Sequence, residues 1–340
     1  MRTDDFDYRL PEAFIAQRPV EPRDASRLIV MDRAGGSLTH FSFHELPRFL
    51  TRGDALVLNE TRVIPGRLAA MKIPHGGRVE ILLLRRLGSQ TWEALVGGRG
   101  LKSGSRLIVL HGPEAEIVDE LGGARRVVRF ARPISEELGR IGQVPLPPYI
   151  HVPLKDPEEY QTVYAARPGS AAAPTAGLHF TGGLLERIKT TGVDIVKVVL
   201  HVGLDTFQPV TEEDPRGHLI HSEWCRVSPE AAAAVNRAKA AGRRVIAVGT
   251  TTTRTLETAG LNAPAGQTVT SFEGASELYI LPGFRFKVVD ALITNFHLPR
   301  STLLMMVSAF AGRERILAAY ETAKQLGYRF YSFGDAMLIL

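Results

Sequence analysis

The chain has 340 residues, of which 44% are hydrophobic and 23% are charged, and its net charge is +5. This length suggests about two domains, and this composition is typical of a globular protein and excludes disordered and fibrous classes. The single cysteine, Cys225, excludes an intrachain disulfide and fits a reducing compartment. The first residues carry two acids, and the longest apolar run, within 303–311, is far shorter than the roughly 20 residues of a membrane span. We therefore expect a cytoplasmic protein without a secretory signal or a membrane partner.

The N-terminal part contains two apolar runs, 28–31 and 55–58, that predict buried strands. The proline- and arginine-rich run 18–27 before them is not expected to form a regular element. The second strand leads directly into Asn59-Glu60-Thr61-Arg62. Because α/β folds place ligand-binding groups at strand ends, these polar residues indicate a ligand site, with a surface turn as the alternative.

From about Pro65 to Pro148 the sequence changes to short apolar or alternating runs separated by Gly-rich turns. The expected strands are 79–84, 91–96, 106–110 and 126–130. This pattern favours a small β-barrel or sandwich, and prolines mark both of its ends. We predict an inserted domain at 65–148 that interrupts a larger mixed α/β domain formed by 1–64 and 149–340.

The excess positive charge falls in one internal segment. Residues 66–150 carry 13 basic and 8 acidic side chains, whereas the remainder carries 28 of each. Such a segment attracts a polyanion first, although the charges can equally be solvated faces of a small β domain.

The stretch 169–180 is rich in glycine and alanine and ends in His179-Phe180. Small residues let a backbone lie close to a ligand, and Pro174 fixes the direction of the chain. The composition predicts either the floor of a ligand site or a flexible connector between domains.

The C-terminal half alternates predicted strands and helices. Strands are expected at 193–200, 244–248 and 288–293, and helices at 184–190, from Ser228-Pro229 to Gly242, from Ser301 to Ala311 and at 314–326, with a final strand at 328–333. The segment 249–257 contains four consecutive threonines and predicts a hydroxyl-rich loop that leads into a helix. Such a helix start favours an anion or a ribose, although threonine also simply favours strands.

His218, His221 and Cys225 have spacings of three and four, which are compatible with metal ligands on one helix face. A fourth ligand is not evident, and Pro215 and Gly217 argue against a helix that begins earlier. We therefore predict no metal.

Several motifs together resemble the S-adenosylmethionine:tRNA ribosyltransferase-isomerase family of queuosine biosynthesis. They span nearly the whole chain and comprise 21–28 (EPRDASRL), 59–67 (NETRVIPGR), 160–165 (YQTVYA), 169–180, 201–204 (HVGL), 221–223 (HSE), 249–257 (GTTTTRTLE), 294–299 (TNFHLP) and 333–338 (FGDAML). Two residues depart from the family pattern: Asp205 stands where glycine is usual, and Ala171 where valine is usual.

The resemblance implies an enzyme that transfers and isomerises the ribosyl part of S-adenosylmethionine onto 7-aminomethyl-7-deazaguanine in the wobble position of a tRNA anticodon. Epoxyqueuosine-tRNA, adenine and methionine would be the products, and no metal would be needed. The family's fold is a larger mixed α/β domain interrupted by a small β-barrel, and its members are described as monomers, so no obligate protein partner is expected.

That chemistry needs a base, an acid for the departing adenine, and groups that hold the methionine and the ribose. Neutral histidine suits the base, and we place His179 or His297 first, with His201 and His221 as further candidates. Arg254 is the predicted partner of the methionine carboxylate. Three residues are candidates, without a ranking, for the acid or for binding the ribose: Glu223, Glu277 and Asp335. The remaining substrate-binding candidates are Asp24, Arg27, Asn59, Arg62, Thr175, Thr251, Thr252 and Asn295. The predicted tRNA-binding residues are Arg85, Arg86, Arg125 and Arg126.

Two other functions compete with this one. A methyltransferase would share the cofactor, but a Gly-rich strand-to-helix loop followed by an acidic strand end is missing. A non-catalytic RNA-binding module would explain the basic segment but not the polar residues at the strand ends.

Overall fold

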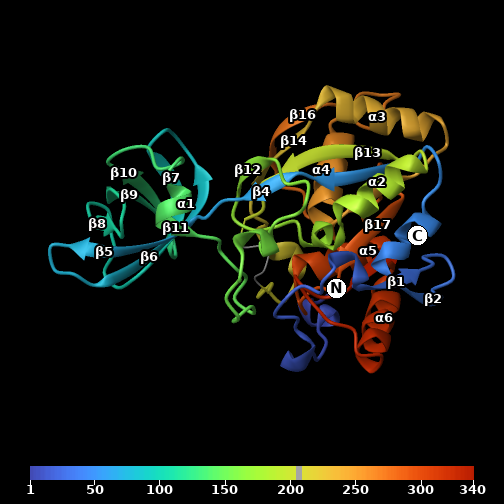
Figure 1. Cartoon of the computed structure of the whole chain (residues 1–340), viewed down its shortest axis with the longest axis horizontal. Coiled ribbons are helices and arrows are strands. Elements are labelled where there is room, and N and C mark those ends of the chain that lie inside the picture. The colour runs from blue at the N-terminus through green and yellow to red at the C-terminus, as the bar shows by residue number, and fades with distance from the viewer. Residues whose placement is uncertain (204–208) are drawn as a thin grey trace. The chain divides into compact units, whose positions relative to one another are not determined.

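The computed structural model describes residues 1–203 and 209–340. These residues form two compact units (Figure 1). The larger unit comprises Met1–Thr61, Pro148–Arg167 and Pro174–Leu340, and the smaller unit comprises Arg62–Pro147 and Pro168–Ala173. Segments 62–64 and 168–173, which the sequence analysis assigned to the larger domain, lie in the smaller unit in this division, and residue 148, assigned to the inserted domain, lies in the larger unit.

The larger unit is built on a nine-stranded mixed sheet with the order β16-β14-β13-β3-β15-β17-β18-β1-β2. Strands β13, β3, β15 and β17 are parallel to one another, and β18 is antiparallel to β17. The strands are β1 (Arg27–Met31), β2 (Leu38–Ser42), β3 (Ala55–Asn59), β13 (Asp194–Leu200), β14 (Glu223–Val227), β15 (Val245–Val248), β16 (Phe272–Ser276), β17 (Ala291–Asn295) and β18 (Ala336–Ile339).

Both faces of this sheet are covered. Alternate residues of β3 point to opposite faces, so that Ala55 and Val57 belong to one apolar core and Leu56 and Leu58 to the other. Residues of α3 (Pro229–Ala240), α4 (Thr250–Leu261), α5 (Thr302–Ala311) and α6 (Arg313–Gln325) join the first core, and residues of α2 (Gly182–Thr190), η4 (Phe43–Phe49) and η6 (Thr175–His179) join the second. The other short 3-10 helices are η1 (Thr3–Phe6), η2 (Glu12–Phe14), η3 (Arg23–Ala25), η5 (Pro157–Tyr160) and η8 (Pro215–Gly217).

Helices α3 and α5 begin at the predicted caps, and α2, predicted at 184–190, begins two residues earlier, after the cap Thr181. Thr181, Ser228 and Ser301 each accept a hydrogen bond from the backbone N–H three residues later, at the starts of α2, α3 and α5. A side-chain oxygen at this position satisfies one of the otherwise unpaired N–H groups of the first turn.

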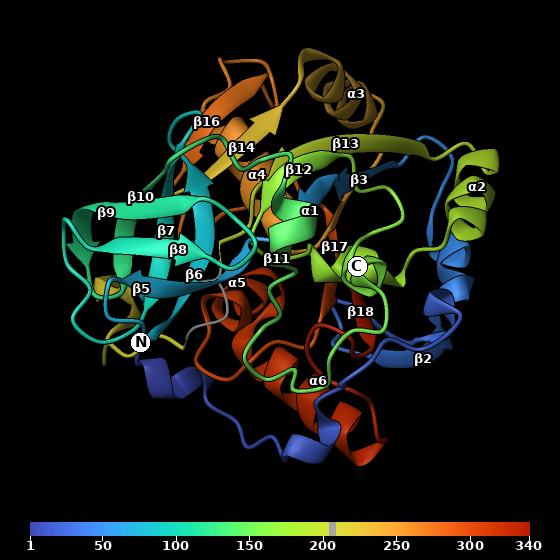
Figure 2. The ribbon, with the colours of Figure 1, turned by 60° about the vertical axis from the view of Figure 1, so that its left-hand side comes forward.

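The smaller unit is a closed antiparallel barrel (Figure 2). Its six strands are β5 (Arg67–Ile73), β6 (Arg78–Arg86), β7 (Thr91–Gly97), β8 (Arg106–Val109), β9 (Glu114–Gly122) and β10 (Arg125–Phe130), and β5 closes the barrel by pairing with β8. The interior is filled by residues such as Leu68, Ile81 and Leu107. Short α1 (Leu138–Ile141) and β11 (Gly142–Gln143) follow, and β4 (Thr61–Val63) and β12 (Arg167–Ser170) form a separate pair.

The predicted fold class, a mixed α/β domain with a small β-barrel, is confirmed, and two local predictions were wrong. The segment 328–333 is not a strand; the last strand is β18. Its alternating pattern arises because Tyr328 and Phe330 pack against the ring of Phe296. The threonine-rich segment is not a loop either, because Thr250 already begins α4.

Candidate functional site

One edge of the larger sheet collects polar residues from six strands. The parallel strands β13, β3, β15 and β17 all end there, and β18 and β1 begin there, since they run in the opposite direction. Carboxyl ends of parallel strands are the usual position of ligand-binding groups in α/β sheets. We call this edge the polar edge; its residues are Ser26, Asn59, His201, Gly249, Asn295 and Asp335.

Asn59 joins β3 to β13 at the polar edge. Its amide Nδ2 donates to the Leu200 carbonyl at 3.0 Å, and its Oδ1 accepts from the Leu200 N–H at 3.0 Å. Nδ2 also lies 3.3 Å from Thr251 Oγ1, at the start of α4. The side-chain amide of Asn59 thus pairs with the backbone of Leu200 as a strand residue would, and it fixes Leu200 and Thr251 in position.

His179 is the centre of a buried network formed by η6, β17 and the residue before β1. Asn295 Nδ2 donates to His179 Nε2 at 3.1 Å, so Nδ1 carries the proton and donates to Ser26 Oγ at 2.8 Å. Asn295 Oδ1 accepts from Thr175 Oγ1 at 3.1 Å. Burial, together with Arg329 and Arg23, lowers the pKa of His179 to about 3. His179 is therefore neutral, and both of its nitrogens are occupied.

Gly177 explains why η6 is built from small residues. A Cβ at this position would lie 2.0 Å from Tyr164 Oη and 2.8 Å from Thr162 Cγ2. Only glycine therefore lets η6 pack against the segment that carries Thr162 and Tyr164.

His297 lies just beyond β17 and is also buried. Its Nε2 is 2.7 Å from Thr294 Oγ1, and its backbone N–H donates to Tyr320 Oη at 2.9 Å. The hydroxyl of Tyr8 donates to its carbonyl. Burial lowers the pKa of His297 to about 3, so this residue is neutral too.

His201 follows β13 and differs from the other two histidines. Its Nδ1 is 2.8 Å from Thr61 Oγ1, and its ring stacks on Trp224 with the centroids 5.0 Å apart. Within the described part of the chain, its Nε2 has no hydrogen-bond partner. The residue is only half-buried, and burial lowers its pKa to about 4. His201 therefore combines a neutral ring, a fixed orientation and a nitrogen that no described residue uses.

Arg254 and Glu223 form a buried ion pair between α4 and β14. Arg254 Nη1 contacts Glu223 Oε2, while Nε donates to the Leu278 carbonyl at 3.1 Å. Glu223 Oε1 accepts from the Gly203 N–H at 2.8 Å. The guanidinium that the sequence analysis assigned to a methionine carboxylate thus already faces a carboxylate of the protein.

The threonines of α4 are largely occupied by their own helix. The hydroxyls of Thr252, Thr253 and Thr255 donate to the carbonyls four residues earlier, at 2.6 to 3.2 Å. These three hydroxyls are thus bonded within the helix, and Thr252 has no exposed surface, while its role in substrate binding stays a prediction. Thr251, which contacts Asn59, is the predicted threonine that reaches the polar edge.

Asp335 and its neighbours organise the strand starts. Asp335 accepts from the backbone N–H groups of Arg27 at 3.0 Å and Arg329 at 2.8 Å. Arg27 itself donates to the Leu326 carbonyl at 2.7 Å and lies over the Tyr328 ring. Asp24 accepts from Thr181, the cap of α2, at 2.8 Å. These side chains hold backbone and helix ends in place.

The comparisons with known proteins agree with one another. A model of the family described as queuosine biosynthesis protein matches residues 3–339. The chain is 53% identical to the S-adenosylmethionine:tRNA ribosyltransferase-isomerase of Symbiobacterium thermophilum and 54% identical to that of Desulfitobacterium hafniense, in each case over 100% of both chains. The chain belongs to the queuosine biosynthesis protein family. The expected family is thus confirmed, and with it the expectation of a transferase-isomerase enzyme.

A solved structure in the family supports the fold. The crystal structure of S-adenosylmethionine tRNA ribosyltransferase from Thermotoga maritima matches 99% of this chain and 100% of that chain, with 39% identity and a TM-score of 0.57. The departure from the family pattern at Asp205 lies outside the described residues.

Three predicted site residues are not among the residues that define the polar edge. Glu277 follows β16 and is exposed, and His221 precedes β14 and is half-buried. Arg62 lies in β4 and belongs to the smaller unit. Their predicted roles in this family member stay predictions.

The predicted tRNA-binding arginines lie in the barrel, but three of them face carboxylates. Arg85 and Arg125 share Glu93, at 3.1 and 3.4 Å. Arg126 pairs with Glu120 at 3.5 Å and donates to the Leu101 carbonyl at 3.2 Å. Of the four, Arg86 is the one without a carboxylate partner among residues 1–203 and 209–340, and its Nε donates to the Gly88 carbonyl at 2.9 Å.

The helical arrangement considered for a metal site is wrong. Cys225 lies in strand β14, whereas His218 follows η8, so the three side chains do not share a helix face. Among the described residues, no group of three or more His, Cys, Asp or Glu side chains could hold a metal ion. Burial raises the pKa of Cys225 to about 12. None of the helices described for the chain is long and apolar enough to cross a membrane.

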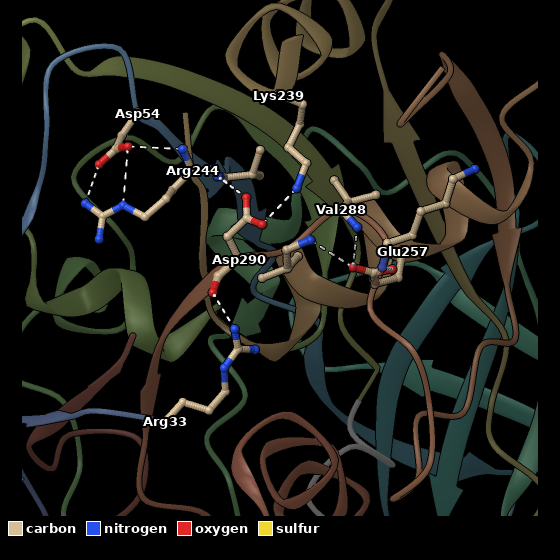
Figure 3. Close-up of polar contacts among 10 residues, drawn as sticks. Arg33, Asp54, Lys239, Arg244, Glu257, Val288 and Asp290 are labelled. Carbon is tan, nitrogen blue, oxygen red and sulfur yellow. Dashed lines mark hydrogen bonds and ion pairs between the residues drawn. The ribbon is translucent and has the colours of Figure 1, made fainter. Parts of the chain in front are cut away.

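The opposite edge of the sheet is also polar but is closed by ion pairs (Figure 3). Asp54, before β3, pairs with Arg244 at 2.6 Å, and Asp290, before β17, pairs with Lys239 at 2.8 Å. Glu257 accepts from the backbone N–H groups of 287, 288 and 289 at 2.9 to 3.0 Å. Burial raises the pKa of Glu257 although these bonds oppose the change. The carboxylates at this edge are therefore already bound by partners within the protein.

Sequence reasoning missed the residues that orient the histidines. Ser26 and Thr61 fix two of the imidazole rings, and Trp224 stacks on His201. Each stands inside or next to a motif of the family, which was the available signal. The partners of Ser26 and Thr61 lie more than 100 positions away in the sequence, so the roles of these two residues emerge only from the sheet register.

Proposed function

We propose that this protein transfers and isomerises the ribosyl group of S-adenosylmethionine onto 7-aminomethyl-7-deazaguanine in the wobble position of a tRNA anticodon. The products are epoxyqueuosine-tRNA, adenine and methionine. In this proposal S-adenosylmethionine is the ribosyl donor, and no metal takes part. A monomer in the cytoplasm stays the prediction for the working form of the enzyme.

The observation that carries this proposal is the match over the full length. Relatives with 53 to 54% identity over the whole chain bear the name of this activity. The polar edge supports it, because the motif residues Asn59, His201 and Asn295 come together there although they are far apart in the sequence.

We propose His201 as the base that removes a proton beside the sulfonium. Its pKa of about 4 keeps it neutral near pH 7, and its Nε2 is unused among the described residues. Thr61 and Trp224 fix the ring, which a positioned base requires. His179 and His297 were our first choices from sequence. Both ring nitrogens of His179 have partners within the protein, and His297 is buried and bonded through Nε2 to Thr294, whereas His201 is only half-buried.

We propose that Glu223 and Arg254 act as a unit that positions the start of α4 beside the substrate. The Glu223 carboxylate also fixes Gly203, two residues after His201. The guanidinium of Arg254 already donates to Glu223 and to the backbone carbonyls of Leu278 and Ser276. Arg254 can therefore bind the methionine carboxylate only through its remaining N–H groups.

The test is an incubation of the purified protein with S-adenosylmethionine and tRNA that carries the 7-deazaguanine precursor. We expect adenine and methionine in equal amounts and a matching gain in tRNA mass, measured by chromatography and mass spectrometry. The control is the same tRNA with guanine at the wobble position, which lacks the attacking amine and should release no adenine.

The other outcomes identify the competing functions. S-adenosylhomocysteine and a methylated tRNA would mean a methyltransferase. Binding of tRNA without consumption of S-adenosylmethionine would mean an RNA-binding module. Either result contradicts the proposed function.

A further inference from the structure

Most of the unpaired positive charge of the barrel, four of five such side chains among the described residues, lies in two turns. Most of its arginines face a carboxylate: Arg106 pairs with Glu114 at 2.6 Å and Arg129 with Glu116 at 2.7 Å, and Arg132 and Arg140 both pair with Glu137. Among the described residues, five basic side chains of the barrel have no carboxylate within ion-pair distance; they are Lys72, Arg78, Arg86, Arg99 and Lys102. Arg86 is at the opposite end of β6 from Arg78. The other four belong to two turns.

These two turns are neighbours in the barrel. Lys72 and Arg78 flank the β5–β6 turn, whose ends are joined by the Lys72 N–H and the Gly77 carbonyl at 3.0 Å. Arg99 and Lys102 lie in the β7–β8 connection, and the Lys72 ammonium donates to the Arg99 carbonyl. We call Lys72, Arg78, Arg99 and Lys102 the basic turn patch.

The surroundings leave the patch positive and open. Arg78, Arg99 and Lys102 are exposed. The β7–β8 connection, residues 98–105, contains no acidic residue. Glu120 of β9 receives the Ser103 N–H at 3.3 Å and is already paired with Arg126. In β6, the carboxylate of Glu80 is paired with Arg67 at 3.9 Å rather than with a residue of the patch.

The glycines of these turns leave room for a ligand. A Cβ added at Gly76, Gly100 or Gly104 would meet no atom within 4 Å. Each of these residues has a positive φ, so the turns require glycine for their backbone shape and present bare main chain beside the cations. Exposed cations beside a bare backbone suit phosphate oxygens, which accept from both.

We propose that the basic turn patch binds the phosphate backbone of the tRNA substrate. This inference rests on the proposed function, which supplies tRNA as the partner, and it moves the predicted RNA contact away from Arg85, Arg125 and Arg126. The patch acts through its charge, and the nucleobase is recognised at the site of the reaction. It therefore governs the affinity for tRNA and its dependence on salt.

The experiment compares two variants with the same net charge. The patch variant carries Lys72→Ala, Arg78→Ala, Arg99→Ala and Lys102→Ala. The control variant carries Arg106→Ala, Arg129→Ala, Arg132→Ala and Arg140→Ala, which removes four exposed arginines that are paired in the same barrel. The Kd for precursor-bearing tRNA is measured from 50 to 200 mM salt, and thermal unfolding shows that both variants are folded.

We expect the patch variant to lose the salt dependence that four phosphate contacts produce. Each contact contributes about 0.7 to the slope of log K against log salt, so the slope becomes shallower by about 3. Between 50 and 200 mM salt, wild type should lose about 50-fold more affinity than the patch variant. The control variant should keep most of the wild-type slope.

Equal slopes in the two variants would overturn the proposal, and so would a patch variant that keeps the wild-type Kd at 50 mM salt. Binding of the patch to vesicles of anionic lipid, with tRNA affinity unchanged, would assign it to a membrane surface and also overturn it. Adenine release by wild type at low salt is measured in parallel. The absence of adenine release would contradict the proposed function. The Kd values and their salt dependence would still test whether the basic turn patch binds tRNA.

Discussion

At the scale of single residues, three histidines whose pKa values are lowered by burial have different surroundings. His179 uses both ring nitrogens for Ser26 and Asn295, and His297 is tied to Thr294, Tyr8 and Tyr320. His201 is only half-buried, whereas the other two are buried, and its Nε2 has no partner among the described residues. A lowered pKa alone therefore does not identify the base, because burial produces it at structural positions as well.

We predict that His201→Gln lowers kcat for adenine release by about 100-fold or more, the usual contribution of a general base. Glutamine retains a hydrogen-bonding group but cannot take up the proton. In wild type, kcat should fall as the pH drops through the pKa of this base, which is about 4 in the free enzyme, because only the neutral ring accepts a proton. The measurement is the pH–rate profile of both proteins.

The matched control for this prediction is His44→Gln. His44 is an exposed residue of η4, and its side chain contributes to neither core. It should keep the wild-type kcat and pH profile. Full turnover by the His201 variant, or the same acid limb in both proteins, would remove His201 as the base.

The sequence identified the motif residues at the polar edge but not their roles. His179, His201, His297, Asn59 and Asn295 were all predicted. Which nitrogen of which ring is occupied depends on contacts such as that between Ser26 and His179, across 153 positions of sequence. These contacts follow from the order and register of the strands, which local patterns do not contain.

At the scale of elements, α4 shows why local propensity failed. Threonine disfavours helices because its branched side chain is restricted and competes for backbone hydrogen bonds. In this helix the hydroxyls donate to the carbonyls one turn earlier, and all residues from Thr250 to Gly260 are buried. Burial between the sheet and its neighbours offsets the poor propensity.

The buried pair between α4 and β14 is predicted to be structural as well as functional. Glu223→Gln leaves the Arg254 guanidinium buried without its carboxylate, and the loss of one partner of such a pair costs about 3–5 kcal/mol. Arg254→Met leaves the carboxylate unpaired and should cost a similar amount. The free energy of unfolding is measured by urea denaturation.

The double variant Glu223→Gln with Arg254→Met separates the two roles. Because it leaves no buried charge unpaired, it should be more stable than either single variant. If Arg254 also holds the methionine carboxylate, the recovery in stability will not restore the KM for S-adenosylmethionine. Strictly additive losses would contradict the structural pairing, and a normal KM in the double variant would contradict the contact with methionine.

At the scale of the whole molecule, the main architecture could be predicted from the sequence. Gly-rich turns between short apolar runs indicated the barrel, and alternating strands and helices indicated the larger sheet. The barrel strands β5 and β9 were missed because their exposed positions carry alanine, methionine or acids rather than a clear alternation. The basic turn patch was missed because ion pairing, which decides which arginines are free, depends on cross-strand neighbours.

The larger unit is predicted to lose stability in mild acid because of its three neutral histidines. Their pKa values in the folded protein, about 3 for His179 and His297 and about 4 for His201, lie below the unfolded value of about 6.5. Above pH 6.5 the folded and unfolded states bind the same protons at these rings. As the pH falls below 6.5, the unfolded chain takes up protons that the folded state refuses, so each histidine costs about 1.4 kcal/mol per pH unit until its folded pKa is reached.

This prediction is tested by urea denaturation at pH 7, 6, 5 and 4, followed by the helical circular dichroism signal. That signal reports the larger unit, because α2 to α6 all belong to it. Between pH 6 and pH 4, His297→Gln should make the slope of unfolding free energy against pH shallower by about 1.4 kcal/mol per pH unit, whatever its effect on stability at pH 7. His44→Gln should leave the slope unchanged. Parallel pH dependences for wild type and His297→Gln would show that the ring of His297 is protonated in the folded state, against the burial that the structure gives it.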